Sequence, residues 1–269
     1  MEETATTVRK IDLHRFDLNQ GSVGAMRDEV AADEVVCIFV NERYYRALIA
    51  SPGMRRELVV GHLLGEGVVE SVDEVKEVEI GPTKVYVTLS KEVELDLLTQ
   101  GRVDLITTAC GAPTRPLRDN ELGFSKIGSG VEVRAYDISL MVRELNRRGV
   151  LFRRTGGVHS AMLYSPDGNC LAFAEDVGRH NAVDKVIGAG ALKGINMGGC
   201  VLISSGRQSG DIVLKAARVG VPVIASVSAP LSSGIRIAEA AGITLICFVR
   251  GRRMNVYTHP QRVSISGGV

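Results

Sequence analysis

The C-terminal half of the chain contains three short, continuously apolar runs, at residues 200–204, 222–226 and 244–249. Runs of this kind are typical of strands that are buried on both faces. Amphipathic segments follow the first two runs, at 211–220 and 231–242, and predict helices. Strands that alternate with helices indicate a parallel sheet covered by helices on both faces, with right-handed connections. We therefore expect an α/β fold.

Three further elements are predicted before these runs. Residues 137–149 predict a helix, with Asp137 as its N-cap and Gly149 at its end. Residues 159–176 predict a hairpin around a Pro-Asp-Gly turn. Residues 180–194 predict another helix.

The N-terminal half predicts a smaller unit of strands and one helix. Two strands, 34–41 and 44–51, are separated by a short polar turn. Apolar residues recur at helical spacing over 54–69 and predict one helix with a buried face. Residues 74–90 predict a second hairpin.

A glycine- and proline-rich passage, residues 107–130, separates the two halves. Loops of this length inside a compact domain usually carry function or lack order. We place a domain boundary near its end, which gives an N-terminal α/β domain at 1–128 and a second domain at 129–269. A chain of 269 residues is long enough for two such domains.

The composition restricts the kind of partner. The chain has 32 basic and 31 acidic residues, a net charge of +1, whereas proteins that follow a nucleic-acid backbone are usually far more basic. Tryptophan is absent, which argues against a platform for stacking bases. We therefore expect no nucleic-acid partner, and we expect any anionic ligand to be a small molecule in a local pocket.

The expected location is the cytoplasm. No apolar run is long enough to span a bilayer, so no membrane partner is expected. Residues 1–17 lack the apolar core of a secretory signal. The five cysteines form no C-x-x-C pair, which predicts neither a disulfide framework nor a zinc ribbon in a reducing compartment.

The ends of the three predicted strands indicate a binding site. Ligands of open parallel α/β sheets bind beyond the carboxyl ends of the strands. Small, hydroxyl-bearing or cationic residues follow all three: Ser204, Ser205, Gly206 and Arg207; Ser226, Val227, Ser228 and Ala229; and Arg250, Gly251, Arg252 and Arg253. Serine and glycine are also good caps and turn formers. Three such loops on adjacent strands, two of them leading into helix N-termini, nevertheless favour a site for a phosphorylated ligand. Neither a dinucleotide fingerprint nor a P-loop is present.

Two further segments concentrate titratable groups. His159 stands at the start of the predicted hairpin, after two glycines, and residues 175–185 place acids, Arg179 and His180 around a helix start. Such density often marks a site. The alternative is a capped helix with Asp184 and Lys185 on a solvated face. We do not expect a metal, because His159, His180 and Cys110 provide no local ligand pair.

Cys110 is the candidate reactive thiol. It lies in the glycine- and proline-rich passage near Arg115 and Arg118, and a cationic environment favours the thiolate. The other four thiols have a structural interpretation. Cys37, Cys200 and Cys247 lie in apolar strand runs and Cys170 follows a hairpin turn.

The chain resembles the FdhD family, the formate dehydrogenase accessory sulfurtransferases. The resemblance extends from about residue 34 onward, and GRHNAVDK and NVYTHPQR are its most specific strings. The motifs that carry it are CG (110–111), RTGGVHSA (154–161), EDVGRHNAVDKVIG (175–188), SSGR (204–207), VPVIASVSAP (221–230) and NVYTHPQR (255–262).

The resemblance implies a C-terminal, cytidine-deaminase-like three-layer domain, a smaller α/β N-terminal domain and a homodimer. It implies a sulfurtransferase that takes persulfide sulfur from a cysteine desulfurase and passes it to the molybdenum (or tungsten) bis-pterin guanine dinucleotide cofactor that formate dehydrogenase requires. The family's persulfide cysteine maps onto Cys110. Its cofactor-binding segment maps onto Phe248, Val249, Arg250, Gly251, Arg252 and Arg253, and the strand-end residues Ser204, Ser205, Gly206, Arg207 and His180 are expected to contribute.

One departure from the family pattern leaves alternatives open. Members often carry C-G-x-C-G in this passage, but here Pro113 replaces the second cysteine. The first alternative is a chaperone that binds and inserts the cofactor without transferring sulfur. The second is a hydrolase or transferase of free nucleotides that uses His159 or His180 as a base. Deamination is not expected, because the P-C-x-x-C zinc signature is absent.

Overall fold

The computed structural model describes residues 6–93, 126–128 and 130–265. Its largest sheet has six strands in the order β13-β12-β11-β10-β8-β9. Strands β10, β11 and β12 are parallel to one another, as the three apolar runs predict. The strands are β8 (His159–Tyr164), β9 (Cys170–Asp176), β10 (Val201–Ser204), β11 (Val223–Ser226), β12 (Thr244–Arg250) and β13 (Arg253–Val256).

The sheet is mixed, because both flanks are antiparallel. The predicted hairpin 159–176 is β8 and β9, and β8 runs antiparallel to β10. Arg250, Gly251, Arg252 and Arg253 are expected as a loop, but the chain turns back at Gly251 and Arg252 and continues as β13, which pairs antiparallel with β12. Strand β13 has only four residues, so its alternation of exposed and half-buried side chains is too short to identify it in the sequence.

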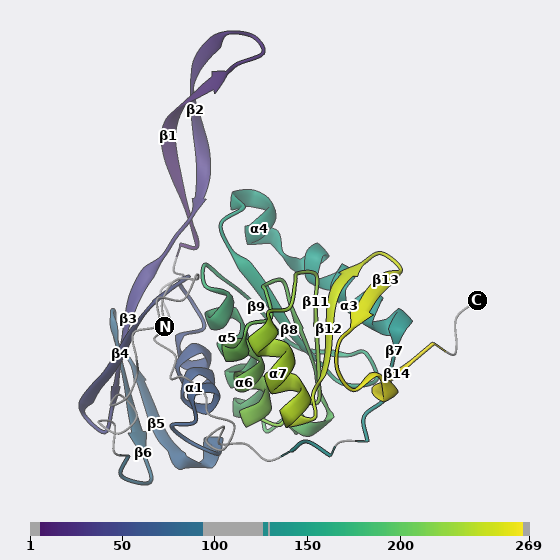
Figure 1. Cartoon of the computed structure of the whole chain (residues 1–269). Helices are drawn as coiled ribbons and strands as arrows, with labels where there is room; N and C mark the ends of the chain where they lie inside the picture. Colours follow the sequence, from purple (N-terminus) through teal and green to yellow (C-terminus); the bar gives the residue numbers. More distant parts are fainter. Residues whose placement is uncertain (1–5, 94–125, 129, 266–269) are drawn as a thin grey trace.

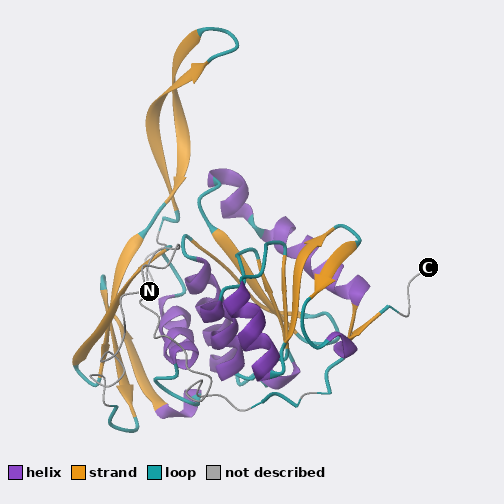
Figure 2. Ribbon diagram, viewed as in Figure 1, coloured by secondary structure: helices purple, strands orange, loops and turns teal. Residues whose placement is uncertain are grey.

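Helices cover both faces of the sheet in the described residues, as Figures 1 and 2 show. One face carries α5 (Arg179–Leu192), α6 (Gly210–Arg218) and α7 (Ser232–Ala241), and the other carries α3 (Ala135–Arg148). Alternate strand residues pack to opposite sides because side chains alternate along a strand. Ile203 and Ile246 pack with α3, whereas Leu202 and Leu245 pack with the three-helix face. The α/β expectation is confirmed.

The α3 helix ends before Gly149 as predicted, but the prediction of Asp137 as its N-cap is wrong. The N-cap residue is Arg134, and no side chain caps the helix. Asp137 lies in the first turn, where its carboxylate accepts a hydrogen bond from Arg134 Nε at 2.6 Å. An acid in the first turn is favoured by the helix dipole, so this position resembles an N-cap in sequence.

The N-terminal half forms a second sheet of four strands in the order β4-β3-β6-β5. Its two hairpins and helix α1 (Arg55–Glu66) are those predicted. Asn41 and Glu42, in the first turn, both have positive φ, as a two-residue hairpin turn of type I′ requires. The strands are β3 (Glu34–Val40), β4 (Arg43–Ala50), β5 (Val75–Ile80) and β6 (Lys84–Leu89).

Helix α1 lies between the four-stranded sheet and the helices α5 and α6 (Figure 1). The two helices α1 and α5 touch backbone to backbone where Gly61 faces the Asp184 carbonyl and Gly188 faces the Glu57 carbonyl. A Cβ atom at either glycine would overlap the opposite main chain. One buried apolar cluster therefore runs from β3 and β6 through α1 to the six-stranded sheet. The boundary at 128/129 stays a prediction.

Residues 8–31 form a long two-stranded ribbon that the sequence pattern does not predict. Strands β1 (Val8–Asp17) and β2 (Ser22–Ala31) pair antiparallel and project from the body beside the short helix α4 (Val150–Thr155), as Figure 1 shows. Both faces are largely exposed, so no alternation of buried and exposed residues marks the strands. The remaining elements are β7 (Val133–Arg134), β14 (Val263–Ser264) and the short 3₁₀ turns η1 (Val72–Glu74), η3 (Met197–Gly199) and η4 (Pro260–Arg262).

Candidate functional site

The loops after β10 and β11 lie side by side at the carboxyl end of the parallel strands. Gln208 N donates to Ala229 O at 3.0 Å, and Leu231 N donates to Gln208 O at 2.9 Å. These bonds extend the β10–β11 pairing by one bridge, between Gln208 and Pro230. The predicted grouping of these strand-end loops is therefore confirmed.

The antiparallel strand β8 brings His159 to the same edge. Ser205 N donates to Ser160 O at 2.9 Å, and Ser160 N donates to Ser205 Oγ, also at 2.9 Å. His159 Nδ1 lies 3.3 Å from Ser205 Oγ. The segments that contain Ser160 and Ser205 are 45 residues apart in the sequence, and each was predicted separately as part of a site. Direct hydrogen bonds join them in the structure.

The start of α5 completes this edge. Asp176 at the end of β9 is buried, and its Oδ1 accepts hydrogen bonds from Gly178 N and Asn181 Nδ2, both at 2.9 Å. The stem of Arg179 lies over Gly206, where an added Cβ would be 2.9 Å from Arg179 Cβ. Gly206 is therefore required for close packing of the helix start on the strand-end loop.

Ser51 follows β4, an edge strand of the N-terminal sheet, and holds the segment before α5 in place. Ser51 N donates to Asp176 Oδ2 at 3.0 Å, and Val177 N donates to Ser51 Oγ at 3.1 Å. Lys185 Nζ lies 2.7 Å from Asp176 Oδ2 and donates to Ser51 O at 2.9 Å. Ser51, immediately after β4, thus fixes the position of Asp176 and of the helix start that follows it.

Both histidines at this edge have lowered pKa values. Burial lowers the pKa of His159, and the cations Arg179 and Arg207 lower it further. Burial, Lys215 and Arg179 lower the pKa of His180 to about 4. His180 Nε2 is buried without a hydrogen-bond partner among the described residues and lies 3.8 Å from Asp211 Oδ2. Both imidazoles are therefore neutral at pH 7, and the charged groups around His159 are Arg179, Arg207 and Asp176.

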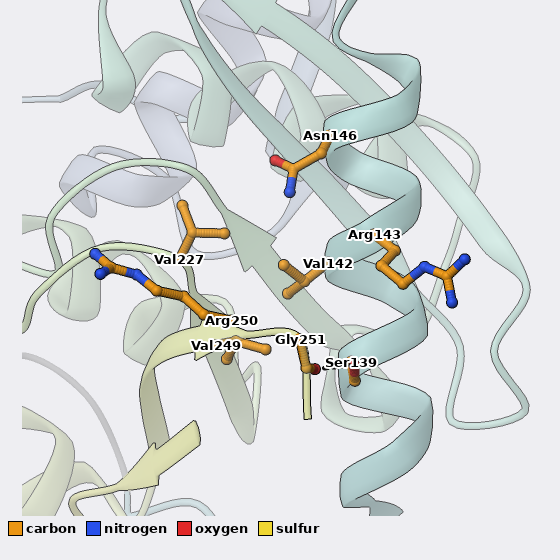
Figure 3. A pocket seen from close by; sticks show the side chains of 8 residues that line it. All are labelled: Ser139, Val142, Arg143, Asn146, Val227, Val249, Arg250 and Gly251. Atoms are coloured by element: carbon orange, nitrogen blue, oxygen red, sulfur yellow. Dashed lines mark hydrogen bonds between the residues drawn. The ribbon is translucent and has the colours of Figure 1, made fainter. Parts of the chain in front are cut away.

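A cavity of about 410 Å³ opens between α3 and the ends of β11 and β12 (Figure 3). Its described lining contains two arginines, an asparagine and three valines but no acidic side chain. The lining residues are Ser139, Val142, Arg143, Asn146, Val227, Val249, Arg250 and Gly251. A volume of this size is within the range of small-molecule sites, about 300–1,000 Å³. An anion with an apolar portion fits this chemistry.

The predicted segment 248–253 is only partly in this cavity. Val249, Arg250 and Gly251 line it. Phe248 is displaced by a register shift between β12 and β13 and has a positive φ of 54°. The Arg250 guanidinium carbon lies 5.6 Å from the centroid of the Phe248 ring, a cation–π contact. Arg252 and Arg253 are exposed on the turn.

The other predicted residues gather at the neighbouring strand end. Ser204, Ser205, Gly206, Arg207 and His180 are absent from the cavity lining. Ser204 is buried, and its Oγ accepts from Gly206 N at 3.1 Å, so this hydroxyl shapes the turn. Arg207 is exposed.

Sequence reasoning missed the helix α3 as one wall of the cavity. Arg143 and Asn146 are three residues apart and therefore share a helix face, a signal that was present in the sequence. Ser139 Oγ donates to Gly251 O and ties the β12–β13 turn to α3. Figure 3 shows Asn146 and Val142 on the side of α3 that faces Val227.

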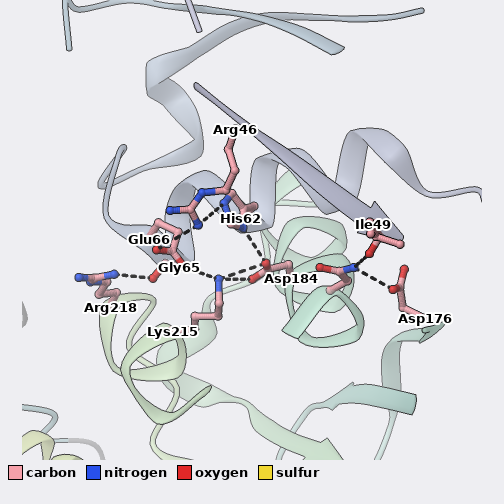
Figure 4. A network of polar contacts seen from close by, with 10 residues as sticks. Arg46, Ile49, His62, Gly65, Glu66, Asp176, Asp184, Lys215 and Arg218 are labelled. Atoms are coloured by element: carbon pink, nitrogen blue, oxygen red, sulfur yellow. Dashed lines mark hydrogen bonds and ion pairs between the residues drawn. The ribbon is translucent and has the colours of Figure 1, made fainter. Parts of the chain in front are cut away.

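The solvated-face interpretation of Asp184 and Lys185 is wrong. Both are buried, and Asp184 belongs to an ion network between α1, α5 and α6 (Figure 4). His62 Nδ1 lies 3.0 Å from Asp184 Oδ2, and Lys215 Nζ lies 2.9 Å from both Asp184 Oδ1 and Glu66 Oε1. Burial alone would lower the pKa of Lys215, but the two carboxylates outweigh burial and raise it. Helical periodicity could not reveal this network, because the pattern shows charges and not their partners.

Cys110, the predicted persulfide carrier, lies outside the described residues. Of the others, Cys200 and Cys247 are buried, as expected, and burial raises the pKa of Cys200 to about 11 and that of Cys247 to about 12. Burial also raises the pKa of the half-buried Cys170. Cys37 is half-buried and therefore less enclosed than its apolar run predicts. The three thiols with raised pKa values are protonated at pH 7 and poor nucleophiles.

Neither a metal site nor a membrane-spanning helix is found among the described residues. No group of three or more His, Cys, Asp or Glu side chains is placed to hold a metal ion there. Among the helices of residues 6–93, 126–128 and 130–265, none has the length and apolar character to cross a membrane.

Comparison with known proteins gives a consistent result. The sequence model of the FdhD/NarQ family matches residues 31–264. The chain is 38% identical to the sulfur carrier protein FdhD of Methanothermobacter thermautotrophicus over 255 residues, which cover 95% of this chain and 98% of that protein. It is 37% identical to the protein of the same name from Sulfolobus acidocaldarius, over 96% of this chain and 99% of that one.

A solved structure shares the fold. It is a candidate formate dehydrogenase accessory protein from Desulfotalea psychrophila, 25% identical in sequence, with a TM-score of 0.78. The match covers 96% of this chain and all of that one. The likeness therefore includes both halves of the fold.

Proposed function

We propose, since this chain belongs to the FdhD/NarQ family, that it carries sulfur to the metal–pterin cofactor of a formate dehydrogenase. Relatives that match almost the whole chain are named sulfur carrier proteins, which supports a role in sulfur transfer. The cavity between α3 and the strand ends carries the proposal for the cofactor, because two arginines line it and its described lining contains no acidic side chain. The cofactor is a substrate in this proposal.

The first step is an exchange at Cys110. Its thiolate attacks the outer sulfur of a persulfide on a cysteine desulfurase, a new S–S bond forms, and the desulfurase thiolate leaves. The product is a Cys110 persulfide, and the desulfurase persulfide becomes a thiol, so the exchange needs no external oxidant or reductant. No other thiol with a resolved pKa shift fits this role, because burial keeps Cys170, Cys200 and Cys247 protonated.

The second step requires a further thiol. Release of the outer sulfur as sulfide, for binding to the metal, consumes two electrons. A second thiol can supply them by attacking the inner sulfur of Cys110 and closing a disulfide. Pro113 replaces the second cysteine of the family pattern, so we assign this role to an external thiol.

The guanine nucleotide end of the cofactor occupies the cavity. Val142, Val227 and Val249 offer an apolar surface to the base, and Arg250 is available to the phosphates. Arg207, beside His159 and Arg179 at the neighbouring strand end, extends the cationic surface toward the rest of the molecule. His180 helps to position this edge.

The proposal includes three properties that the resemblance implies. The chain acts in the cytoplasm, where a desulfurase and free thiols are present. It acts as a homodimer. The domain at 129–269 is of the cytidine-deaminase-like type, with the smaller domain at 1–128.

Mass spectrometry tests the sulfur step directly. The protein is incubated with a cysteine desulfurase and cysteine, and the Cys110 peptide is expected to gain the mass of one sulfur atom. Cys110→Ser should gain none, whereas Cys170→Ser, the matched control, should gain it as the wild type does. Sulfur that still accumulates on the Cys110→Ser protein would refute the assignment.

A second candidate is a chaperone that binds and inserts the cofactor without transferring sulfur. Pro113 at the position of the second cysteine favours it. This candidate predicts binding of GDP, as a probe for the nucleotide end, with no persulfide on Cys110. The two measurements together therefore separate the candidates.

A further inference from the structure

His159 stands where the start of β8 meets the loop after β10, and its ring has a partner that fits both of its protonation states. Ser205 Oγ accepts a hydrogen bond from Ser160 N at 2.9 Å and lies 3.3 Å from His159 Nδ1. The hydroxyl can therefore donate its proton to Nδ1 of the neutral ring, or accept a hydrogen bond from Nδ1–H of the protonated ring with its second lone pair. Protonation of His159 thus breaks no hydrogen bond among these groups.

Two arginines from separate elements help to keep this ring neutral. The stem of Arg179, at the start of α5, lies along Gly206, where an added Cβ would be 3.0 Å from Arg179 Cδ. Arg207 follows Gly206 in the loop between β10 and α6 and is exposed. Burial lowers the pKa of His159, and the positive charges of Arg179 and Arg207 lower it further. A negative charge that offsets the two arginines would therefore favour the protonated ring.

Asp176, the acid that faces His159, does not offset both arginines. It lies directly opposite His159 in the β8–β9 pair, and its charge raises the pKa of His159. However, Lys185 Nζ lies 2.7 Å from Asp176 Oδ2, so a buried cation already pairs with this carboxylate. His180, beside Arg179 at the start of α5, is neutral at pH 7, because burial and neighbouring cations lower its pKa to about 4. The edge is therefore short of negative charge.

The start of α5 suits an anion at this edge, to which the proposed function brings the cofactor. Helix α5 has no side-chain cap and no acid in its first turn, so its dipole favours an anion there. We propose that an anionic group held between Arg179 and Arg207 makes His159 take up a proton from solvent, so that this edge binds the anion and the proton together. The anion offsets the two cations and attracts the imidazolium directly. The inference rests on the proposed function and adds a proton to its binding step.

Linkage fixes how large the effect is. An opposite charge within about 4–6 Å typically shifts a pKa by about 1–3 units toward the charged form. The anion binds more tightly when the pH is below the pKa of His159 in both the free and the bound state than when it is above both. For each unit by which the anion raises that pKa, the difference in affinity is about tenfold. We therefore expect binding to tighten by about tenfold or more on acidification.

Calorimetry of the full-length chain with sulfate tests the coupling. Sulfate is a suitable probe, because its charge stays constant over the range of about pH 5 to 8 in which histidine titrates. At matched ionic strength, sulfate should bind the wild type about tenfold or more tightly at the acidic end of this range than at the basic end. His159→Gln should lose this difference. His14→Gln is the matched control and should keep it, because His14 is exposed on β1. Circular dichroism should confirm that both variants are folded.

NMR of the histidine rings provides a second measurement. Sulfate should raise the pKa of His159 by about one unit or more and leave that of His14 unchanged, and Arg207→Ala should weaken both the binding and the shift. Sulfate that binds equally at both ends of the pH range, or a pH dependence that persists in His159→Gln, would overturn the inference. Absence of sulfate binding would overturn it as well. In each case the proposed sulfur transfer stands or falls separately, with the mass of the Cys110 peptide.

Discussion

The crossing of α1 and α5 predicts a strong and specific sensitivity to a single methyl group. In Gly61→Ala the new Cβ would overlap the Asp184 carbonyl and lie 2.7 Å from Gly188 N, whereas ordinary contact begins at 3.4 Å. Main-chain atoms cannot rotate away, so the two helices must separate by at least 0.7 Å, the difference between these distances. A gap of about 0.5–1 Å already forfeits a quarter to a half of the dispersion energy of each contact.

The expected cost follows from this separation. Overpacking in cores costs about 1–3 kcal/mol, and a backbone clash belongs at the upper end. Alanine gains about 1 kcal/mol of helix propensity over glycine, which offsets part of the loss. We expect Gly61→Ala to lower the free energy of unfolding by about 2 kcal/mol, the difference between these two terms.

Urea unfolding followed by far-UV circular dichroism measures this loss. With a slope of about 3 kcal/mol/M, the midpoint should fall by about 0.7 M. Two glycines provide a graded control. Gly65→Ala meets the Lys215 side chain at 2.9 Å and should cost less, while Gly199→Ala meets nothing within 4 Å and should be near neutral. If Gly61→Ala were as stable as Gly199→Ala, the inferred helix contact would be refuted.

Three further predictions use the buried charges and the cavity. Asp184→Leu removes one of the two carboxylates that pair with buried Lys215 and should destabilise the chain by about 3 kcal/mol in urea unfolding; an unchanged midpoint would contradict the network. The pKa of His180 is lowered from 6.5 to about 4, so its contribution to stability is present above pH 6.5 and is lost as the pH falls toward 4. This contribution amounts to about 3 kcal/mol. The free energy of unfolding should therefore change less between pH 7 and pH 4 in His180→Gln than in the wild type. Arg250→Ala should weaken GDP binding by about tenfold in calorimetry, whereas Arg236→Ala, on exposed α7, should not; equal effects would remove the cavity as the nucleotide site.

The parts of the fold that bury apolar side chains could be predicted from the sequence. The runs that form β10, β11 and β12 are continuously apolar because both faces of these strands are covered. The turn residues Asn41 and Glu42 separate two strands because both adopt the left-handed conformation of a tight hairpin. In both cases local chemistry and final structure agree.

The exposed parts could not be predicted from the same signals. The ribbon of β1 and β2 buries neither face, and β13 has only four residues, so its alternation of exposed and half-buried side chains is too short to stand out from its neighbours. The pairing of Asp184 with His62 joins residues 122 positions apart, a distance that no single-sequence pattern can span.

The meeting of the strand-end loops could be predicted from the sequence, whereas the contribution of α3 to the cavity could not. Parallel strands place their carboxyl ends together, so the position of Arg250 beside Val227 in the cavity follows from the order of the elements. The contact of Ser205 with His159 depends on β8 pairing antiparallel with β10, which the sequence pattern did not predict. Arg143 and Asn146 lie on α3, which covers the face of the sheet opposite to α5, α6 and α7. The rule that ligands bind at strand ends does not predict that a helix on this face lines the cavity.

The hydrogen bonds that join Ser51 to Asp176 and Val177 have a thermodynamic consequence. Because the segment before α5 is positioned by a residue from the other half of the chain, the edge that carries His159 and His180 is complete only when both halves are folded. Any molecule that binds this edge therefore binds the fully folded chain alone, and its binding energy adds to the stability of every element at once. In hydrogen exchange, amides of β4 should slow together with those of α5, although β4 touches no bound molecule.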